Sequence, residues 1–293
     1  MSELNFRVDE NKCIHCGLCQ KDCVAYVLDM DTLNFPRANR PQQCIKCGHC
    51  MAICPVGAIS IFNKNPENAE QIQIQNPDMI LNLIKSRRSN RQYKKENVNK
   101  ETLFKLKDML KWVPTGCNAH SLYFSFIDDI EVMEEFRNYT NEKIINALKN
   151  KGIKMIADKF TPFLQHFLNG EDIIFRGAPH LVAVSNKVSA PCSKEDAIIA
   201  LSYFELYAQS LGLGTCWCGF GDIALNAFPE LCEYLKIPDG YKVQYVMLFG
   251  EKNANYARIT QNEDVTIVSA EKTGIPKIST SGKLKRYFWN MIR

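Results

Sequence analysis

Eight of the thirteen cysteines stand in two near-copies of one spacing. In each copy, three cysteines separated by two residues are followed by a fourth after three more residues: CIHCGLCQKDC begins at Cys13 and CIKCGHCMAIC at Cys44. This spacing puts three thiols on one tight loop, where they can hold three corners of an iron–sulfur cage. The fourth thiol lies too far along the chain to close the same cage, so it is expected to cross to the other one.

The crossing of the fourth cysteines predicts two [4Fe–4S] clusters, each held by four thiolates. The expected ligands are Cys13, Cys16, Cys19 and Cys54 for one cluster, and Cys44, Cys47, Cys50 and Cys23 for the other. Gly17 and Gly48 suit loops whose backbone must come close to inorganic sulfide. Two zinc sites or two disulfide knots are the alternatives, but zinc usually takes paired Cys-x-x-Cys units rather than triplets.

The two motifs resemble the bacterial two-cluster ferredoxin domain over about residues 4–64. Pro55 follows Cys54 as expected for that family, whereas Val24 follows Cys23. Each copy is expected to form a short hairpin, within residues 4–9 and 58–63, and a small helix after its cysteine loop. A unit of this size buries little apolar surface, so the clusters should supply much of its folding free energy.

Composition places the rest of the chain among ordinary soluble proteins. Hydrophobic residues make up 46% of the 293 residues and charged residues 23%, and the formal net charge of +4 is too small to indicate a nucleic-acid partner. The start, MSELNFRVDE, lacks a signal peptide, and no apolar stretch is long enough to span a bilayer. We therefore expect a cytoplasmic protein without a membrane partner, whose cysteines are metal ligands or free thiols.

A polar stretch with two prolines, residues 63–77, indicates a domain boundary. The predicted organisation is a ferredoxin domain over 1–64, a linker over 65–77, a second domain over 78–270 and a C-terminal arm over 271–293. The second domain mixes helical patterns (78–86, 103–112, 131–150 and 193–211) with strand patterns (121–129, 178–186, 215–220 and 242–251). Ser193 is expected to cap the longest apolar helix. This mixture predicts a central sheet that is covered by helices on both faces.

Four short features of the second domain together indicate a ligand site, in which the arginines suit phosphate and Asn118 suits recognition through its amide. They are SRRSNR (86–91), PTGCNAH (114–120), LGLGTCWCG (211–219) and the late Arg258. Arginine forks match phosphate geometry, and a glycine turn presents backbone N–H groups. A solvated charge run is the plainer interpretation of SRRSNR by itself. The chain has no G-x-G-x-x-G, so a dinucleotide fingerprint is absent from the sequence.

The order and spacing of these four features, over about residues 78–260, resemble the FMN-dependent nitroreductase family. The resemblance implies an α+β sandwich that forms a homodimer with FMN at the subunit interface. It also implies a set of cofactor-binding residues: Arg87, Arg88, Ser89, Arg91, Pro114, Thr115, Gly116, Asn118, Leu213, Gly214, Thr215 and Arg258. The chain departs from the family pattern at His120, where Gln is usual, and at Phe249–Glu251, where G-Y-P is usual.

Together the two domains predict a flavin-dependent reductase with its own electron supply. The clusters would pass single electrons to FMN, and FMN would reduce a small organic acceptor such as a nitroaromatic, a quinone or an activated alkene by two electrons. The donor would be reduced ferredoxin or NAD(P)H. An electron-transfer or redox-sensing protein without a substrate is the main alternative. A cluster-free scaffold and a dehalogenase or flavin-destroying enzyme of the same fold are others.

Several residues keep two interpretations. Cys117 and His120 are candidate catalytic groups beside the flavin, and Cys216 and Cys218 are expected to be buried small side chains of one strand. Residues 151–177 are the expected lid, in which Phe160, Phe163 and Phe167 suit a planar acceptor or the core. The basic, aromatic arm 271–293 is expected to pack on the partner subunit, with membrane-surface anchoring or carrier docking as alternatives.

Overall fold

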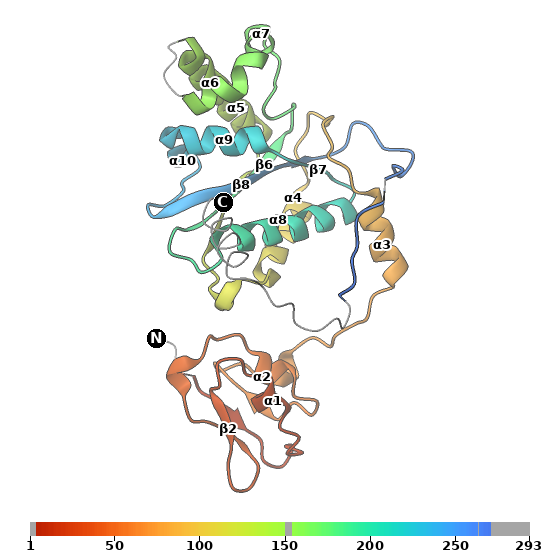
Figure 1. The fold of residues 1–293 in the computed structure, drawn as a ribbon. Helices are drawn as coiled ribbons and strands as arrows, with labels where there is room; N and C mark the ends of the chain where they lie inside the picture. Colours follow the sequence, from red (N-terminus) through yellow and green to blue (C-terminus); the bar gives the residue numbers. More distant parts are fainter. Residues whose placement is uncertain (1–3, 150–153, 263, 271–293) are drawn as a thin grey trace, which may run out of the picture. The chain divides into compact units, whose positions relative to one another are not determined.

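A computed structural model describes residues 4–149, 154–262 and 264–270 (Figure 1). The chain divides into two compact units, Met1–Ile259 and Thr260–Arg293, and the described residues of the second unit form neither helix nor strand. The predicted C-terminal arm and residues 151–153 of the predicted lid lie outside the described residues. Within the ranges that are described, no helix has the length and apolar character needed to cross a membrane.

The cysteine-rich part contains two small antiparallel pairs of strands and two one-turn helices. The strands are β1 (Arg7–Val8), paired with β4 (Ile59–Ser60), and β2 (Leu28–Met30), paired with β3 (Pro36–Ala38). The helices are α1 (Leu18–Lys21) and α2 (His49–Ala52). Each helix is preceded by a glycine in the left-handed conformation, Gly17 at φ 68° and Gly48 at φ 72°, which a residue with a Cβ adopts only at a cost.

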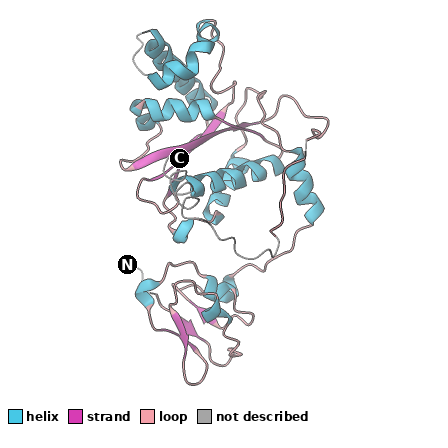
Figure 2. Ribbon diagram, viewed as in Figure 1, coloured by secondary structure: helices cyan, strands magenta, loops and turns pink. Residues whose placement is uncertain are grey.

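The second domain is built around one antiparallel sheet with strand order β5-β6-β8-β7 (Figures 1 and 2). The strands are β5 (Leu122–Ile127), β6 (His180–Lys187), β7 (Gly214–Trp217) and β8 (Tyr241–Gly250). Seven of the eight residues of β6 are buried, as a central strand with both faces covered requires. The covered sheet and three of the predicted strands are confirmed. The strand expected over 215–220 is wrong at its end, because β7 stops at Trp217 and the next helix begins at Gly219.

Helices cover both faces of the sheet, as Figure 1 shows. The helices of this domain are α3 (Pro77–Ser86), α4 (Lys100–Met109), α5 (Ile130–Lys149), α6 (Lys154–Phe160), α7 (Leu164–Leu168), α8 (Ser193–Ser210), α9 (Gly219–Ala227) and α10 (Pro229–Tyr234). Alternate residues of β6 enter different cores: Leu181 packs with α5, α6, α7, α9 and α10, whereas Val182 packs with α4 and α8. The period of two along the strand therefore produces two hydrophobic layers.

Two local expectations are wrong. Residues 4–9 and 58–63 do not form separate hairpins, because Arg7 and Val8 pair with Ser60 and Ile59 of the other copy. Cys192, not Ser193, precedes the first turn of α8, and its side chain makes no capping hydrogen bond. The hydroxyl of Ser193 instead accepts a hydrogen bond from Gln244 Nε2 on β8, at 3.0 Å.

The region of the expected lid is largely helical and contributes to the core. Phe160 and Phe167 are buried in the layer of α5, α6 and α7, and Phe163 packs against the same layer with Phe220. These rings therefore serve as core rather than as an acceptor surface. The end of this segment is held by Asp172, which accepts a hydrogen bond from Arg137 Nε at 2.7 Å.

Candidate functional site

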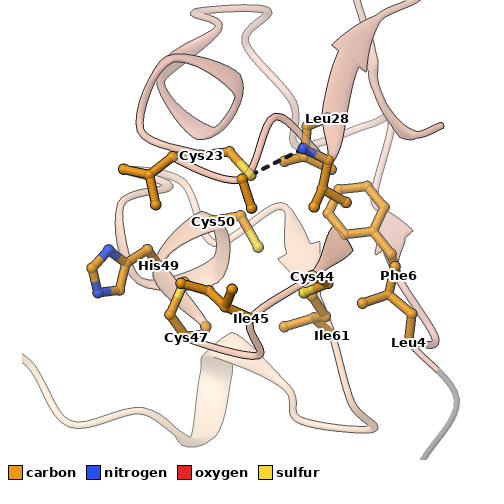
Figure 3. Close-up of a pocket in the computed structure, with 14 residues that line it drawn as sticks. Leu4, Phe6, Cys23, Leu28, Cys44, Ile45, Cys47, His49, Cys50 and Ile61 are labelled. Atoms are coloured by element: carbon orange, nitrogen blue, oxygen red, sulfur yellow. Dashed lines mark hydrogen bonds between the residues drawn. The ribbon is translucent and has the colours of Figure 1, made fainter. Parts of the chain in front are cut away.

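Two cavities in the cysteine-rich part are each lined by four cysteines. Cys23, Cys44, Cys47 and Cys50 line the first cavity, and Cys13, Cys16, Cys19 and Cys54 line the second. These are the two sets that follow from crossing the fourth cysteines. Figure 3 shows the first cavity, with Phe6, Leu28 and Ile61 around the four thiols. The apolar lining restricts water, which is one of the ways in which a protein sets the potential of a cluster.

Backbone N–H groups point at three of these sulfurs. Val27 donates to Cys23 Sγ at 3.4 Å, Lys46 to Cys44 Sγ at 3.4 Å and Ala58 to Cys54 Sγ at 3.2 Å. Such bonds stabilise negative charge on a ligating sulfur. Val27 and Ala58 each lie four residues after the cysteine they contact, whereas Lys46 lies within the second cysteine loop; none of the three is a glycine named from the sequence.

The buried thiols of these cavities must lose their protons before they can bind a metal, because the thiolate is the ligand. Burial raises the pKa of the Cys50 thiol to about 12, and burial also raises the pKa of Cys19. A metal site must therefore displace protons from these thiols when it forms. Within the described ranges no group of His, Cys, Asp or Glu converges for a single metal ion. Four thiols spread around a cavity fit a larger, four-iron cage, so the donor sets fit the predicted clusters better than zinc. That the eight cysteines are cluster ligands stays a prediction.

The basic segment after α3 lies along the glycine-containing strand β7. Ser89 and Thr215 form a parallel bridge, and the Asn90 N–H donates to the Thr215 carbonyl at 2.7 Å. A Cβ on Gly214 would lie 2.7 Å from Asn90 Cβ, so only glycine permits this close approach. The structure thus brings two of the four predicted features together.

A third feature joins them from the end of the first unit. The Tyr256 hydroxyl donates to the Ser89 carbonyl at 3.2 Å, and Arg258, which is exposed, follows two residues later. Arg91 is exposed and Arg87 is half-buried, while Leu213 and Thr215 are buried. Leu213 and Thr215 are buried as whole residues, and the Leu213 N–H is bonded to the Ala208 carbonyl at 3.0 Å. Guanidinium groups and a serine hydroxyl form a donor set that suits a phosphate.

Behind this segment lies a charged residue that sequence reasoning missed. Glu205 on α8 is 5% exposed and contacts Arg87, Thr215 and Trp217. One signal was present in the sequence: Glu205 occupies an inward position of α8, four residues after Leu201 and three before Ala208, both fully buried. A carboxylate in an apolar stripe requires partners, and these partners belong to the predicted binding segment.

The loop Pro114–His120 has strained backbone at three residues with side chains. Cys117, Asn118 and His120 have φ values of 53°, 54° and 44°. Side chains rarely adopt this region, and functional loops are among the places where it persists. His120 Nε2 and Asn118 Oδ1 are 2.8 Å apart, and Asn118 Nδ2 donates to the Ile45 carbonyl, between Cys44 and Cys47, at 2.9 Å.

This loop is fixed at the opposite end of α8 from the basic segment. The Gly116 N–H donates to Asp196 Oδ1 at 2.8 Å, and a Cβ on Gly116 would lie 2.6 Å from Cys192 Sγ. Asp196 is 2% exposed and nine residues before Glu205, a rise of about 14 Å along a helix. One chain therefore does not bring the loop beside the arginines.

The remaining cysteines outside the two motifs have different environments. Cys216 and Cys218 are buried in one core layer, as expected, although β7 ends at Trp217 between them. Burial raises the pKa of the Cys218 thiol to about 12 and also raises that of Cys216. Cys117 is exposed. Its role, and that of His120, stays a prediction.

Comparison with known proteins identifies both parts. The profile of the nitroreductase family matches residues 84–251, and that of a 4Fe-4S dicluster domain matches residues 12–59. The first match covers more than half of the chain, so this protein belongs to the nitroreductase family, with a 4Fe-4S dicluster domain on its N-terminal side. The predicted family and the α+β fold class are confirmed.

Solved structures agree with the fold. A nitroreductase with bound FMN from Bacteroides fragilis is 25% identical, with a TM-score of 0.53, and the match covers 67% of this chain and 100% of that one. A nitroreductase with bound FMN from Desulfitobacterium hafniense is 21% identical at the same TM-score and the same coverage.

Two curated proteins match shorter stretches. Iodotyrosine deiodinase from Thermotoga neapolitana is 28% identical over 144 residues, which cover 47% of this chain and 72% of that protein. An uncharacterized protein from Methanocaldococcus jannaschii is 33% identical over 66 residues, which cover 22% of this chain and 24% of that protein.

Proposed function

We propose that this protein is an FMN-dependent oxidoreductase that passes electrons through two [4Fe–4S] clusters to FMN and reduces a small organic acceptor by two electrons. The observation that carries the proposal is that two cavities, each lined by four cysteines, occur in one chain with a nitroreductase domain. When bound, the clusters supply electrons singly, and FMN accepts single electrons and releases them as a pair. Reduced ferredoxin or NAD(P)H is the proposed donor.

The residues of this chain would bind the cofactor at two places. The arginines of 87–91, with Ser89 and Arg258, suit the FMN phosphate. Membership of the nitroreductase family would place the segment Leu213–Thr215 near the edge of the ring. The loop Pro114–His120 would lie along the ring. Its hydrogen bond from Asn118 to Ile45, in the loop of the second cysteine motif, supports electron transfer toward this loop.

We propose that the site is completed by a second copy of the chain. The loop and the basic segment are attached to opposite ends of α8, through Asp196 and Glu205 respectively. One protomer would therefore contact one end of the ligand, and its partner would contact the other end. Large apolar side chains on α3, on α4 and just before the loop are also exposed and would be stabilised by burial against a partner: Met79 is 73% exposed, Phe104 68% and Trp112 72%. A homodimer would bury these side chains and place the loop of one protomer against the arginines of its partner.

Anaerobic purification followed by measurement of iron, sulfide and flavin tests the proposal. We expect about eight irons and about one FMN per chain, because two cavities each accept a four-iron cluster. Rapid mixing with reduced ferredoxin or NAD(P)H should then reduce the flavin. A protein with flavin but without iron, or one whose flavin is reduced at the same rate by every donor after Cys47→Ser and Cys50→Ser, would refute the relay.

A panel of acceptors separates the enzyme from the alternative electron-transfer protein. Nitroaromatics, quinones and activated alkenes should reoxidise the reduced flavin. The similarity to the iodotyrosine deiodinase adds a halogenated phenol to the panel. An electron-transfer protein without a substrate would show flavin reduction by the clusters and turnover with none of these compounds.

A further inference from the structure

Glu205 is a buried carboxylate on which donors from two segments converge. Its Oε1 accepts from Arg87 Nη1 at 3.1 Å and from the Thr215 hydroxyl at 3.4 Å, and its Oε2 accepts from Trp217 Nε1 at 3.0 Å. Its side chain is 7% exposed, so the negative charge is removed from water and depends on these partners. Burial of a carboxylate in an apolar helix stripe costs desolvation free energy, so the function of Glu205 is indicated by the groups that it binds.

Gln209, one turn later on α8, extends the same network. Its Nε2 donates to the Thr215 hydroxyl at 3.1 Å and to the Arg88 carbonyl at 3.4 Å. Two polar side chains at i and i+4 of a helix lie on one face, so α8 presents both to the basic segment. The hydroxyl of Thr215, fully buried, accepts from Gln209 and donates to Glu205.

The geometry leaves part of the Arg87 guanidinium available. Only Nη1 of this side chain is directed at Glu205, and the side chain is 35% exposed. A guanidinium has five N–H donors in a planar fork, so one edge can be held by a carboxylate while the rest faces an anion. An arginine held in this way loses less rotamer entropy when it binds its ligand.

We propose that Glu205 is a positioning residue, which fixes Arg87 against β7 so that the arginine meets the phosphate of FMN. This inference rests on the proposed function, because it takes FMN as the ligand. Glu205 acts through Arg87 and does not itself touch the ligand. The opposing effect is that a negative charge near the site repels phosphate. Arg88, Arg91 and Arg258 keep the local excess of positive charge. When the Glu205 charge is removed, the phosphate should therefore lose more affinity from the poorer orientation of Arg87 than it gains from the weaker repulsion.

Two substitutions separate positioning from charge. Glu205→Gln removes the charge at nearly constant shape, whereas Glu205→Asp keeps the charge but draws the oxygens back by one methylene. Both variants should bind FMN about 10-fold more weakly than the wild type, the loss expected when one charge-assisted hydrogen bond no longer orients the arginine. Binding of riboflavin, which lacks the phosphate, should not change. Titration of flavin-stripped protein by flavin fluorescence measures both dissociation constants.

The ratio of the riboflavin and FMN dissociation constants is the readout that a merely structural role would not move. Asp222→Asn is the matched control, because it also removes one carboxylate but lies on α9, against the other face of the sheet. It should leave both constants unchanged. A Glu205 variant that weakens FMN and riboflavin equally, or that binds FMN as tightly as the wild type, would overturn the proposal. If Glu205→Gln does not fold, Glu205→Asp gives the same test.

A double substitution tests the link to Arg87. Arg87→Lys keeps the charge but cannot share a planar fork between two partners, so it should weaken FMN binding by itself. Adding Glu205→Asp to Arg87→Lys should cause no further loss, because the two residues act as one unit. Additive losses would contradict the inference. Wild-type protein that binds no FMN would instead contradict the proposed function.

Discussion

Replacing Gly214 by alanine should displace the basic segment from the sheet. The new Cβ would lie 2.7 Å from Cβ, Cγ and Nδ2 of Asn90, where non-bonded carbon atoms normally stand about 3.5–4.0 Å apart. Asn90 cannot easily move away. It is 2% exposed, its N–H is bonded to the Thr215 carbonyl at 2.7 Å, and its Nδ2 is bonded to the Gln92 carbonyl at 2.8 Å.

The magnitude follows from the cost of inserting a methyl group into a packed site that cannot relax freely. We expect Gly214→Ala to lower the free energy of unfolding by about 1–3 kcal/mol. Because the shift moves Arg87 and Ser89 together with Asn90, FMN binding should weaken by about 10-fold or more, which corresponds to about 1.4 kcal/mol. Urea unfolding followed by tryptophan fluorescence gives the first quantity, and flavin titration gives the second.

A second substitution tests the assigned cause. Asn90→Gly removes the three atoms that the new methyl group would meet, so the double variant should be less destabilised than the sum of the single variants. Gly219→Ala is the control, because its Cβ would meet only the hydroxyl of Tyr245, at 3.2 Å. If Gly214→Ala unfolds and binds FMN like the wild type, or if Asn90→Gly relieves none of the loss, the packing argument is wrong.

Three further predictions concern other parts of the molecule. His180 is buried, which lowers its pKa to about 4, and its Nε2 accepts the Val98 N–H at 3.0 Å. The unfolded chain therefore takes up the proton first, so stability should fall by up to about 1.4 kcal/mol per pH unit as pH drops from about 6.5 to about 4. When the free energy of unfolding is measured with urea at several pH values in this range, it should change less steeply with pH for His180→Gln than for the wild type. An equal dependence on pH would refute the assignment. Cys54→Ser should lower the iron content of the cavity that holds Cys13, Cys16 and Cys19 although Cys54 belongs to the other motif, and spectroscopy that shows only the second motif's cluster affected would contradict the crossing. Met79→Glu should shift the protein from dimer to monomer in light scattering, whereas Lys94→Glu should not, and a dimer of unchanged affinity would place the interface elsewhere.

The sequence was most informative where spacing alone carries the constraint. The interval of three residues between Cys19 and Cys23 already separates that fourth thiol from its own loop, and the two cavities group the cysteines accordingly. The strands around Val182 and Val246 were predictable because buried central strands are continuously apolar. The basic segment, residues 86–91, was visible in the sequence as a local run of arginines.

Non-local choices were not visible in the sequence. Val8 pairs with Ile59 across about fifty residues of chain, and local patterns favour near neighbours instead. The Ser193 hydroxyl is bound by Gln244 from a distant strand, which a capping rule cannot anticipate. Glu205 was passed over because its partners come from segments far apart in the chain, although its place in an apolar stripe was a usable signal.

The exchange of one thiol between the two cysteine motifs has a consequence for how the N-terminal part responds to oxidation. Cys23 lines the cavity of the second motif and Cys54 that of the first. In the proposed arrangement of two clusters, oxidation of either sulfur would remove one ligand from the cluster that the other motif holds. Each proposed cluster would therefore tie the two cysteine motifs together. Loss of one cluster should therefore loosen both cysteine loops, and not only the loop that supplies three of its ligands.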